Sequence, residues 1–84
     1  MLVTIRLFAR LREIAGAAEL GRTLPDGATA RTAWDAIVSD FPPMGDYAAG
    51  VACAVNEEYT RLTTTLHDGD EVAFLPPVSG GASG

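Results

Sequence analysis

ARTAWDAIVSDF, at residues 30–41, is the stretch that decides the fold class. Ala30, Trp34, Ile37 and Phe41 recur at spacings of four, three and four, which places them in one apolar stripe along a helix. Thr29 suits the N-cap position before this helix, and the two prolines at 42–43 end it because proline cannot continue a helix. The pattern predicts one main amphipathic helix with a single face to bury.

Short strand patterns lie on both sides of this helix. Residues 2–7 alternate, with Val3, Ile5 and Leu7 on one face, as in a strand that is buried on one side. Helical spacing follows over residues 8–15 and stops at a glycine. The other expected elements are a strand over 19–24, a turn at 25–27, a helical turn or loop over 44–50, a strand over 51–56, a turn and short strand within 57–65, a turn at 66–69 and a last strand over 70–75.

This order of elements predicts an α+β fold. One amphipathic helix can cover one face of a small mixed sheet, and the ubiquitin-like β-grasp is the obvious two-layer solution of this kind. The 84 residues are enough for one domain. We expect residues 1–77 to form a β-grasp domain and residues 78–84, VSGGASG, to be a flexible glycine-rich C-terminal tail.

The composition narrows the classes of partner. The net charge is −5 and every cation except the single histidine is an arginine, so the chain repels a nucleic-acid backbone and favours a basic protein surface. No apolar run is long enough to cross a bilayer, and the N-terminus lacks the form of a signal peptide. We therefore expect no nucleic-acid partner, no membrane partner and, by elimination, a cytoplasmic location.

An independent active site is not expected. His67 falls in a predicted turn, and Cys53 lies between alanines on a predicted strand, where a structural core thiol is the natural interpretation. The acids at 68, 70 and 71 flank a turn and lack the longer pattern of a calcium loop. No metal site is predicted. The unusual feature is Gly80-Gly81, which is thin enough to enter a narrow channel, although by composition alone such an end is typical of a disordered terminus.

Three stretches resemble the small subunits of molybdopterin synthases, which are ubiquitin-like sulfur carriers. They are LFARLRE at 7–13, AVNEEY at 54–59 and LHDGDEVAFLPPVSGG at 66–81, and the last is the most specific. Sulfur carriers of the thiamine pathway share the Gly-Gly end and the fold but usually lack the first stretch. The resemblance covers positions 7–81 and supports the predicted fold.

The resemblance implies a chemistry that uses the end of the chain as a reagent. An E1-like adenylyltransferase uses ATP and Mg²⁺ to activate the terminal glycine carboxylate, and sulfur from a desulfurase- or rhodanese-type donor displaces AMP to leave a thiocarboxylate. The tail then enters the large subunit of the synthase, where its sulfur attacks cyclic pyranopterin monophosphate, and two such deliveries build the dithiolene. The carrier binds no cofactor and is not catalytic alone, because the active site belongs to the large subunit.

The resemblance also assigns roles to single residues. Gly81 carries the sulfur, and Gly80 keeps the tail slim enough to thread. Phe8, Tyr59 and Leu75 match positions where the family presents apolar side chains to its partners, with ordinary core packing as the alternative for each. For Arg12, an ion pair with partner acids and a simple exposed helical cation are equally open interpretations.

One departure from the family matters. Residues 82–84 follow Gly81, so Gly81 lies within a peptide bond and cannot be adenylated as it stands. Our hypothesis is removal of residues 82–84; a remnant of cloning, a nonfunctional paralogue and use of Gly84 itself are the alternatives. Two other functions stay open: a sulfur carrier for thiamine or cysteine synthesis, and a ubiquitin-like modifier or binding module.

Overall fold

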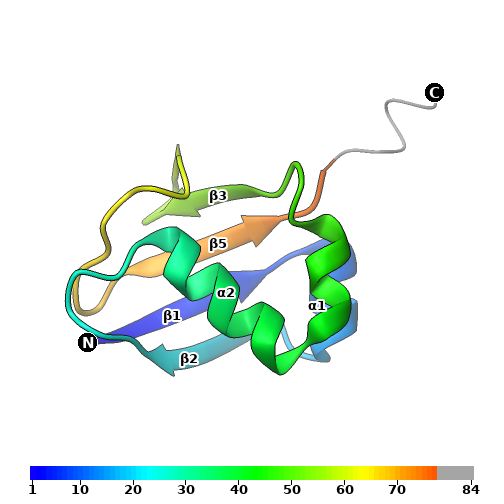
Figure 1. Cartoon of the computed structure of the whole chain (residues 1–84), viewed down its shortest axis with the longest axis horizontal. Helices are drawn as coiled ribbons and strands as arrows, with labels where there is room; N and C mark the ends of the chain where they lie inside the picture. The colour runs from blue at the N-terminus through cyan, green and yellow to red at the C-terminus, as the bar shows by residue number, and fades with distance from the viewer. Residues whose placement is uncertain (78–84) are drawn as a thin grey trace.

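The computed structural model describes residues 1–77, which form a five-stranded mixed sheet with helices packed against it (Figure 1). The strand order is β2-β1-β5-β3-β4; β1 and β5 run parallel, and the other neighbouring pairs are antiparallel. The elements are β1 (Leu2–Leu7), α1 (Ala9–Ala15), β2 (Glu19–Thr23), α2 (Ala30–Asp40), the 3₁₀ helix η1 (Pro42–Tyr47), β3 (Ala52–Val55), β4 (Glu58–Thr60) and β5 (Glu71–Leu75).

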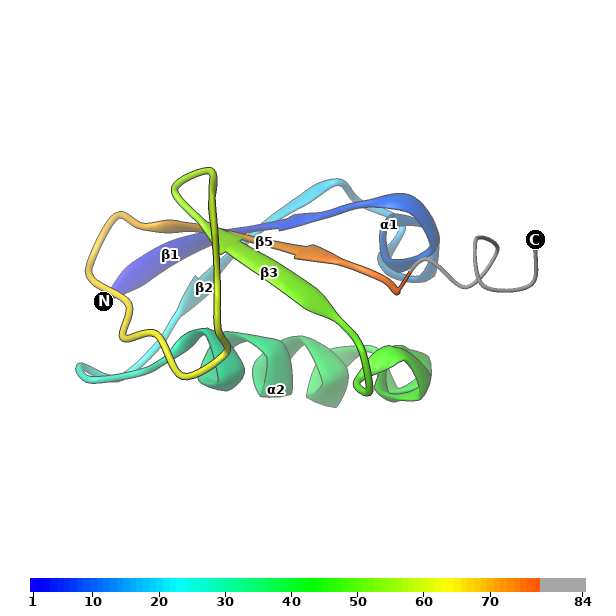
Figure 2. The same ribbon diagram turned by 90° about the horizontal axis from the view of Figure 1, so that it is seen from above.

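The two layers follow from the alternation that the sequence shows. Val3, Ile5 and Leu7 of β1 are each at most 1% exposed, and they face α2. Figure 2 shows α2 and the following turn of helix along one face of the sheet. The α+β class and the β-grasp arrangement predicted from the sequence are confirmed, with one main helix covering one face of a mixed sheet.

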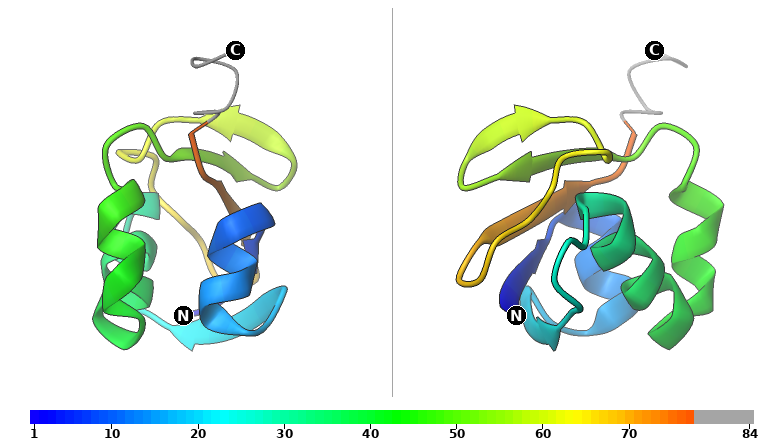
Figure 3. Two further views of the ribbon diagram at one scale, coloured as in Figure 1. Left: turned by 90° about the vertical axis from the view of Figure 1, so that its right-hand side faces the viewer. Right: turned by 60° about the vertical axis from the view of Figure 1, so that its left-hand side comes forward.

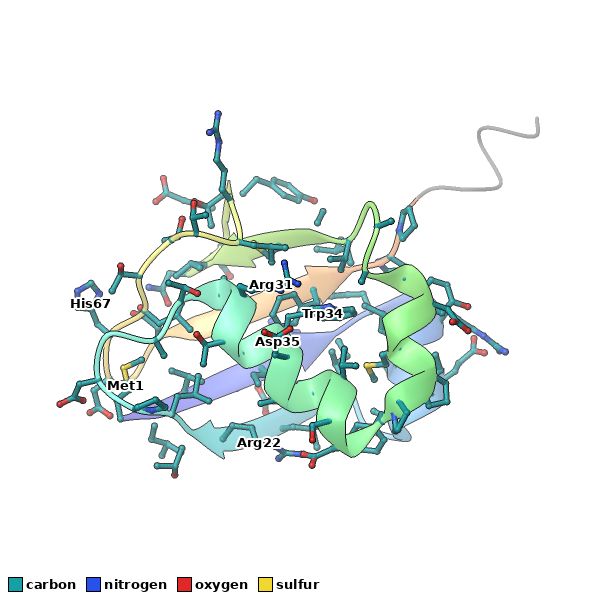
Figure 4. The ribbon with its side chains drawn as sticks, viewed as in Figure 1. Met1, Arg22, Arg31, Trp34, Asp35 and His67 are labelled. Carbon is teal, nitrogen blue, oxygen red and sulfur yellow. The ribbon has the colours of Figure 1, made fainter. Side chains whose placement is uncertain are left out.

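The core is centred on an aromatic pair from the two layers. Trp34 points from α2 toward the sheet (Figure 4), and its ring centroid lies 5.1 Å from that of Phe74 on β5, with the planes tilted by 59°. Tilted aromatic pairs add about 0.5–1.5 kcal/mol to the stabilisation from burial. Ala33 joins the predicted stripe in the core, whereas Phe41 is only partly buried because it caps the helix rather than continuing it.

The beginning of α2 is tied to the long loop between β4 and β5. Thr29 accepts a hydrogen bond from the backbone of Thr32 at 3.3 Å, and the Thr32 hydroxyl accepts one from the Thr29 backbone at 3.0 Å. The next two free N–H groups, of Ala30 and Arg31, donate to backbone carbonyls of this loop, both at 2.9 Å. The first turn of α2 therefore has its backbone donors satisfied.

Replacing Thr29 with alanine is expected to lower the free energy of unfolding by about 1 kcal/mol, because the capping hydrogen bonds are lost. Urea unfolding followed by circular dichroism measures the change. Thr63→Ala is the matched control, since Thr63 is exposed and lies in a loop, outside the helices and strands. Equal losses in the two variants contradict a capping role.

The element boundaries differ from the sequence expectation in a few places. The two prolines end α2, as predicted, but they also begin η1, because proline suits the first positions of a helix, where no donor is needed. The expected turn or loop over 44–50 is therefore mostly 3₁₀ helix. The strands start or stop one residue inside the predicted ranges at several ends. The predicted tail, residues 78–84, lies outside the described residues.

Candidate functional site

The face of the sheet opposite α2 carries no helix (Figure 3). Two alanines, Ala54 and Ala73, lie side by side on this face. Because side chains alternate along a strand, the outward positions of β5 are Glu71, Ala73 and Leu75. Ala54 of β3 pairs with Ala73, and Tyr59 of β4 pairs with Ala54. A row of two alanines between larger residues leaves a hollow in this face.

The hollow is a groove of about 310 Å³. Alanines form its floor, and Phe8, Tyr59 and Leu75 supply apolar walls. Phe8 is 36% exposed and Tyr59 75% exposed, so neither packs in the core, and Leu75 is half-buried. The full lining is Arg6, Phe8, Ala54, Glu57, Tyr59, Glu71, Ala73 and Leu75. We call this lining the open-face groove.

The structure brings together three of the four residues predicted to bind a partner. Phe8, Tyr59 and Leu75 line the open-face groove although they come from three separate segments of the chain. Arg12 is exposed on α1 and is not part of the lining. Leu75 is also the last residue of β5, so the groove lies beside the point where the chain leaves the sheet. Gly80 and Gly81 lie outside the described residues, and their roles stay predictions.

Sequence reasoning missed the charged members of the groove. The Arg6 guanidinium lies over the Phe8 ring, 5.5 Å from its centroid, and 3.8 Å from a carboxylate oxygen of Glu71. A cation–π contact of this kind contributes about 0.5–1 kcal/mol at an exposed site. The alternation of β1 puts Arg6 on the side opposite Val3, Ile5 and Leu7, and Phe8, two residues later, continues that side. The two-residue spacing of Arg6 and Phe8 is the sequence signal from which their contact could have been predicted.

The hairpin between β3 and β4 places Glu57 at the rim of the groove. Asn56 and Glu57 form a two-residue loop with φ of +50° and +71°, and positive φ at both positions is the requirement of a type I′ turn. Asparagine tolerates this conformation and glutamate does not favour it. Asn56 is held in place because its side-chain oxygen accepts a hydrogen bond from the Glu71 backbone at 3.0 Å.

The turn before β5 is structural, as predicted for Asp68, Gly69 and Asp70. Asp68 accepts a hydrogen bond from the Leu2 backbone at 2.7 Å, and Gly69 adopts a φ of +87°. Asp70 accepts from the side chain of Asn56 at 3.0 Å and from the backbone of His67 at 2.8 Å. These hydrogen bonds, the Asn56 contact first, lower the pKa of the Asp70 carboxyl below its ordinary 3.8.

Asp70→Asn is expected to flatten the acid dependence of stability. A carboxyl whose pKa is lowered by folding stabilises the native state above its unfolded pKa, and that stabilisation is lost as the pH falls through the folded pKa, within about pH 5 to pH 1. The variant should also be less stable at neutral pH because an amide cannot accept both hydrogen bonds. Urea unfolding across this range tests the expectation, with the exposed Glu58→Gln as control. If the free energy of unfolding of Asp70→Asn falls with decreasing pH as steeply as that of the unmutated chain, the expectation is wrong.

The other residues considered for chemistry lie apart from the groove. Cys53 is 2% exposed and its thiol lies 3.4 Å from the Thr60 carbonyl; burial raises the pKa of that thiol, so the nucleophilic thiolate is disfavoured. His67 has a side chain that is 81% exposed and lies at the far end of the sheet from the exit of β5 (Figure 4). The prediction of a core thiol and an exposed turn histidine is confirmed.

Residues 1–77 offer neither a cluster of metal ligands nor a helix able to cross a membrane. No group of three or more histidine, cysteine or acidic side chains is placed to hold a metal ion there. None of the helices formed by these residues combines the length and the apolar character that crossing a bilayer requires.

The sequence of this chain is similar to those of known sulfur carrier proteins. Residues 5–81 match the ThiS family. The chain belongs to the ThiS family. Among relatives, it is 38% identical over 79 residues to the molybdopterin synthase sulfur carrier subunit of Arabidopsis thaliana, covering 94% of this chain and 82% of that protein. The same description applies to relatives from Chlamydomonas reinhardtii, at 37% identity, and Homo sapiens, at 33%.

Two solved structures with the same fold are similar to this chain over most of its length. The small archaeal modifier protein 1 of Haloferax volcanii superimposes with a TM-score of 0.82 at 30% identity, covering 96% of this chain and all of that one. A chain in the complex of subunits 1 and 2 of the molybdopterin-converting factor of Helicobacter pylori superimposes with a TM-score of 0.65 at 25% identity, over 93% and 96% of the two chains.

Proposed function

We propose that this chain is the sulfur carrier subunit of a molybdopterin synthase, which carries a thiocarboxylate on Gly81 and donates its sulfur to cyclic pyranopterin monophosphate. The observation that carries the proposal is the placement of Leu75. It lines the open-face groove, and Gly81 is the sixth residue after it. A partner seated in the groove is thereby within reach of the reactive end. The curated relatives named as sulfur carrier subunits support the same function.

The chemistry begins at the end of the chain. After hydrolysis of the peptide bond between residues 81 and 82, a carboxylate oxygen of Gly81 attacks the α-phosphorus of ATP, with Mg²⁺ on an E1-like enzyme, and pyrophosphate leaves. A persulfide sulfur on a desulfurase- or rhodanese-type donor then attacks the acyl carbon and AMP leaves. A further thiol breaks the sulfur–sulfur bond and becomes part of a disulfide, which releases the thiocarboxylate. ATP favours a cytoplasmic site for this sequence of steps.

Delivery needs no acid or base from the carrier. The thiocarboxylate sulfur forms a bond to a side-chain carbon of the pterin, and the oxygen substituent on that carbon leaves. Water then hydrolyses the acyl–sulfur bond, which leaves the sulfur on the pterin and returns the glycine carboxylate. Two carriers supply the two sulfurs of the dithiolene. The carrier contributes proximity, because a tethered sulfur reaches an effective concentration far above that of a free nucleophile.

The partner proposed for the open-face groove is the large subunit of the synthase. Apolar walls at Phe8, Tyr59 and Leu75 suit the buried centre of a protein interface, and the charges of Arg6 and Glu57 suit its rim. The structure of the Helicobacter pylori complex shows that a relative of the same fold is found with a second subunit. Arg12, exposed on α1, is available for partner acids outside the groove.

Mass spectrometry tests the proposal. A chain ending at Gly81 is incubated with ATP, Mg²⁺, an E1-like enzyme and a sulfur donor. We expect a mass gain equal to the exchange of one oxygen for one sulfur, and we expect capture on immobilised synthase large subunit rather than on a thiazole synthase. Capture on the thiazole synthase alone assigns the carrier to thiamine synthesis instead and refutes the proposed pathway.

A ubiquitin-like modifier is the second candidate function. The fit to small archaeal modifier protein 1, with a TM-score of 0.82, favours it. The two functions differ in the fate of the activated glycine: a modifier is joined to lysine side chains of other proteins, whereas a carrier is released as the carboxylate. Lysine adducts in the same incubation, with added cell extract, identify the modifier.

Glu57→Gly is expected to change stability and partner binding in opposite directions. Glycine relieves the cost of a positive φ and loses some chain entropy, for a net gain of about 0.5 kcal/mol in the free energy of unfolding. Removing the rim carboxylate should weaken binding to a basic partner by about threefold at low salt, a difference that shrinks as salt rises. Thermal unfolding and calorimetric titration measure the two effects. If Glu57→Gly raises stability and leaves the affinity unchanged or raises it as well, Glu57 does not contact the partner.

A further inference from the structure

Gly50 lies opposite Pro77 where the pairing of β3 and β5 ends. Ala52 pairs with Leu75 in the antiparallel ladder, and the same register continued by two residues sets Gly50 against Pro77. Both residues after β5 are prolines, which have no N–H to extend the ladder. The chain is therefore held beside the loop before β3 by packing instead of by ladder hydrogen bonds. Figure 1 shows that loop next to the exit of β5.

The contact requires glycine for two reasons. Gly50 has a φ of +98°, and a Cβ built on it would lie 3.2 Å from Cβ and 3.6 Å from Cγ of Pro77. The first distance is shorter than ordinary van der Waals contact, so Pro77 would have to move. Gly27 and Gly69 also have positive φ, of +86° and +87°, but a Cβ on either has nothing within 4 Å. Gly50 is distinguished from them by its close approach to the exit of the chain.

We propose that Gly50 is a positioning residue for sulfur transfer: its bare backbone seats Pro77 and so fixes the point and direction from which the reactive end leaves the domain. The inference rests on the proposed function, in which Gly81 is the reacting residue. Four residues separate Pro77 from the end of Gly81, a reach of up to about 14 Å. A shift of Pro77 moves the point from which this segment starts, and a misplacement of about 1 Å at the reacting atoms can cost about 100-fold in rate. Gly50 acts through Pro77 and touches no reacting atom.

The first experiment measures the direction of the tail without any sulfur chemistry. A nitroxide label is placed on Ser83→Cys, since the buried Cys53 does not compete for labelling, and paramagnetic broadening is recorded on the amides of residues 1–77. Gly50→Ala is compared with Gly27→Ala, which puts alanine at a similar φ without a new contact. We expect a changed set of broadened amides in Gly50→Ala alone, with similar drops in melting temperature in both. An unchanged pattern in Gly50→Ala overturns the proposal.

The second experiment measures transfer by chains ending at Gly81, with a synthase large subunit and pyranopterin. We expect kcat to fall about tenfold in Gly50→Ala and less than twofold in Gly27→Ala. Affinity for the large subunit should stay within twofold in both, because neither glycine lines the open-face groove. Equal kcat values for the two variants overturn the proposal. If the unmutated carrier transfers no sulfur, the proposed function fails while the broadening experiment still decides the role of Gly50.

Pro77→Gly keeps the proposal testable if Gly50→Ala folds poorly. Glycine at 77 removes both atoms that the new Cβ would meet. The coupling of the two sites is then measured by a double-mutant cycle. We expect Pro77→Gly alone to shift the broadening pattern, and Gly50→Ala to add no further shift in that background. Additive shifts would show that Gly50 acts on the loop alone, which overturns the proposal.

Discussion

Removing residues 80–84 is expected to abolish sulfur delivery, a chain ending at Gly81 is expected to deliver sulfur, and the full chain ending at Gly84 is not. The truncated chain has no glycine end long enough to carry the tethered sulfur, so the loss should exceed about 10⁴-fold, the scale of the proximity effect. In the full chain, the carbonyl of Gly81 is an amide and offers no carboxylate to ATP. Reconstitution with the large subunit and pyranopterin measures product for each of the three chains.

The body of the protein supplies the control for this comparison. The core and the open-face groove lie within residues 1–77, so all three chains should unfold at the same temperature and bind the large subunit with similar affinity. A loss of sulfur delivery is then caused by the missing or blocked carboxylate of the C-terminal glycine, because folding and binding are unchanged. Sulfur delivery by the chain that lacks residues 80–84 would refute the carrier mechanism. Equal delivery by chains ending at Gly81 and Gly84 refutes removal of residues 82–84 as a requirement.

The layers of the fold could be predicted because they depend on local periodicity. The stripe of Trp34 and Ile37 and the alternation through Ile5 each specify which side of one element is buried, and the structure buries those sides. The end of α2 was predicted from the proline pair, but the 3₁₀ helix that begins at Pro42 was not, because the same two prolines both end one helix and begin another. Periodicity gives no information about which strand lies beside which.

The site could be predicted only in part for the same reason. Phe8, Tyr59 and Leu75 were named because the chain resembles a family, and no spacing in the sequence joins them. Their meeting depends on β5 lying between β1 and β3, a pairing of distant segments. Such non-local pairing also explains why the sequence predicts Gly50 only as part of a turn or loop over 44–50, since it meets Pro77 across β3 and β5.

Tyr59→Ala is expected to weaken binding to the synthase large subunit by about 30-fold, or about 2 kcal/mol, without loss of stability. Tyr59 is 75% exposed in the free chain, so its ring contributes little to folding. It forms a wall of the open-face groove beside the two floor alanines, and docking of a partner would remove that ring from water. Calorimetric titration with the large subunit measures affinity, and urea unfolding measures stability.

Leu2→Ala is the matched control for Tyr59→Ala. Leu2 is another exposed apolar residue of the sheet, 58% exposed, but it lies at the start of β1 and outside the groove lining. If general surface hydrophobicity drove association, the two variants would lose similar affinity. If the groove is the docking site, Leu2→Ala should bind within about twofold of the unmutated chain while Tyr59→Ala does not. Undiminished binding by Tyr59→Ala would place the interface elsewhere, and the cluster of Phe8, Tyr59 and Leu75 would then need another explanation.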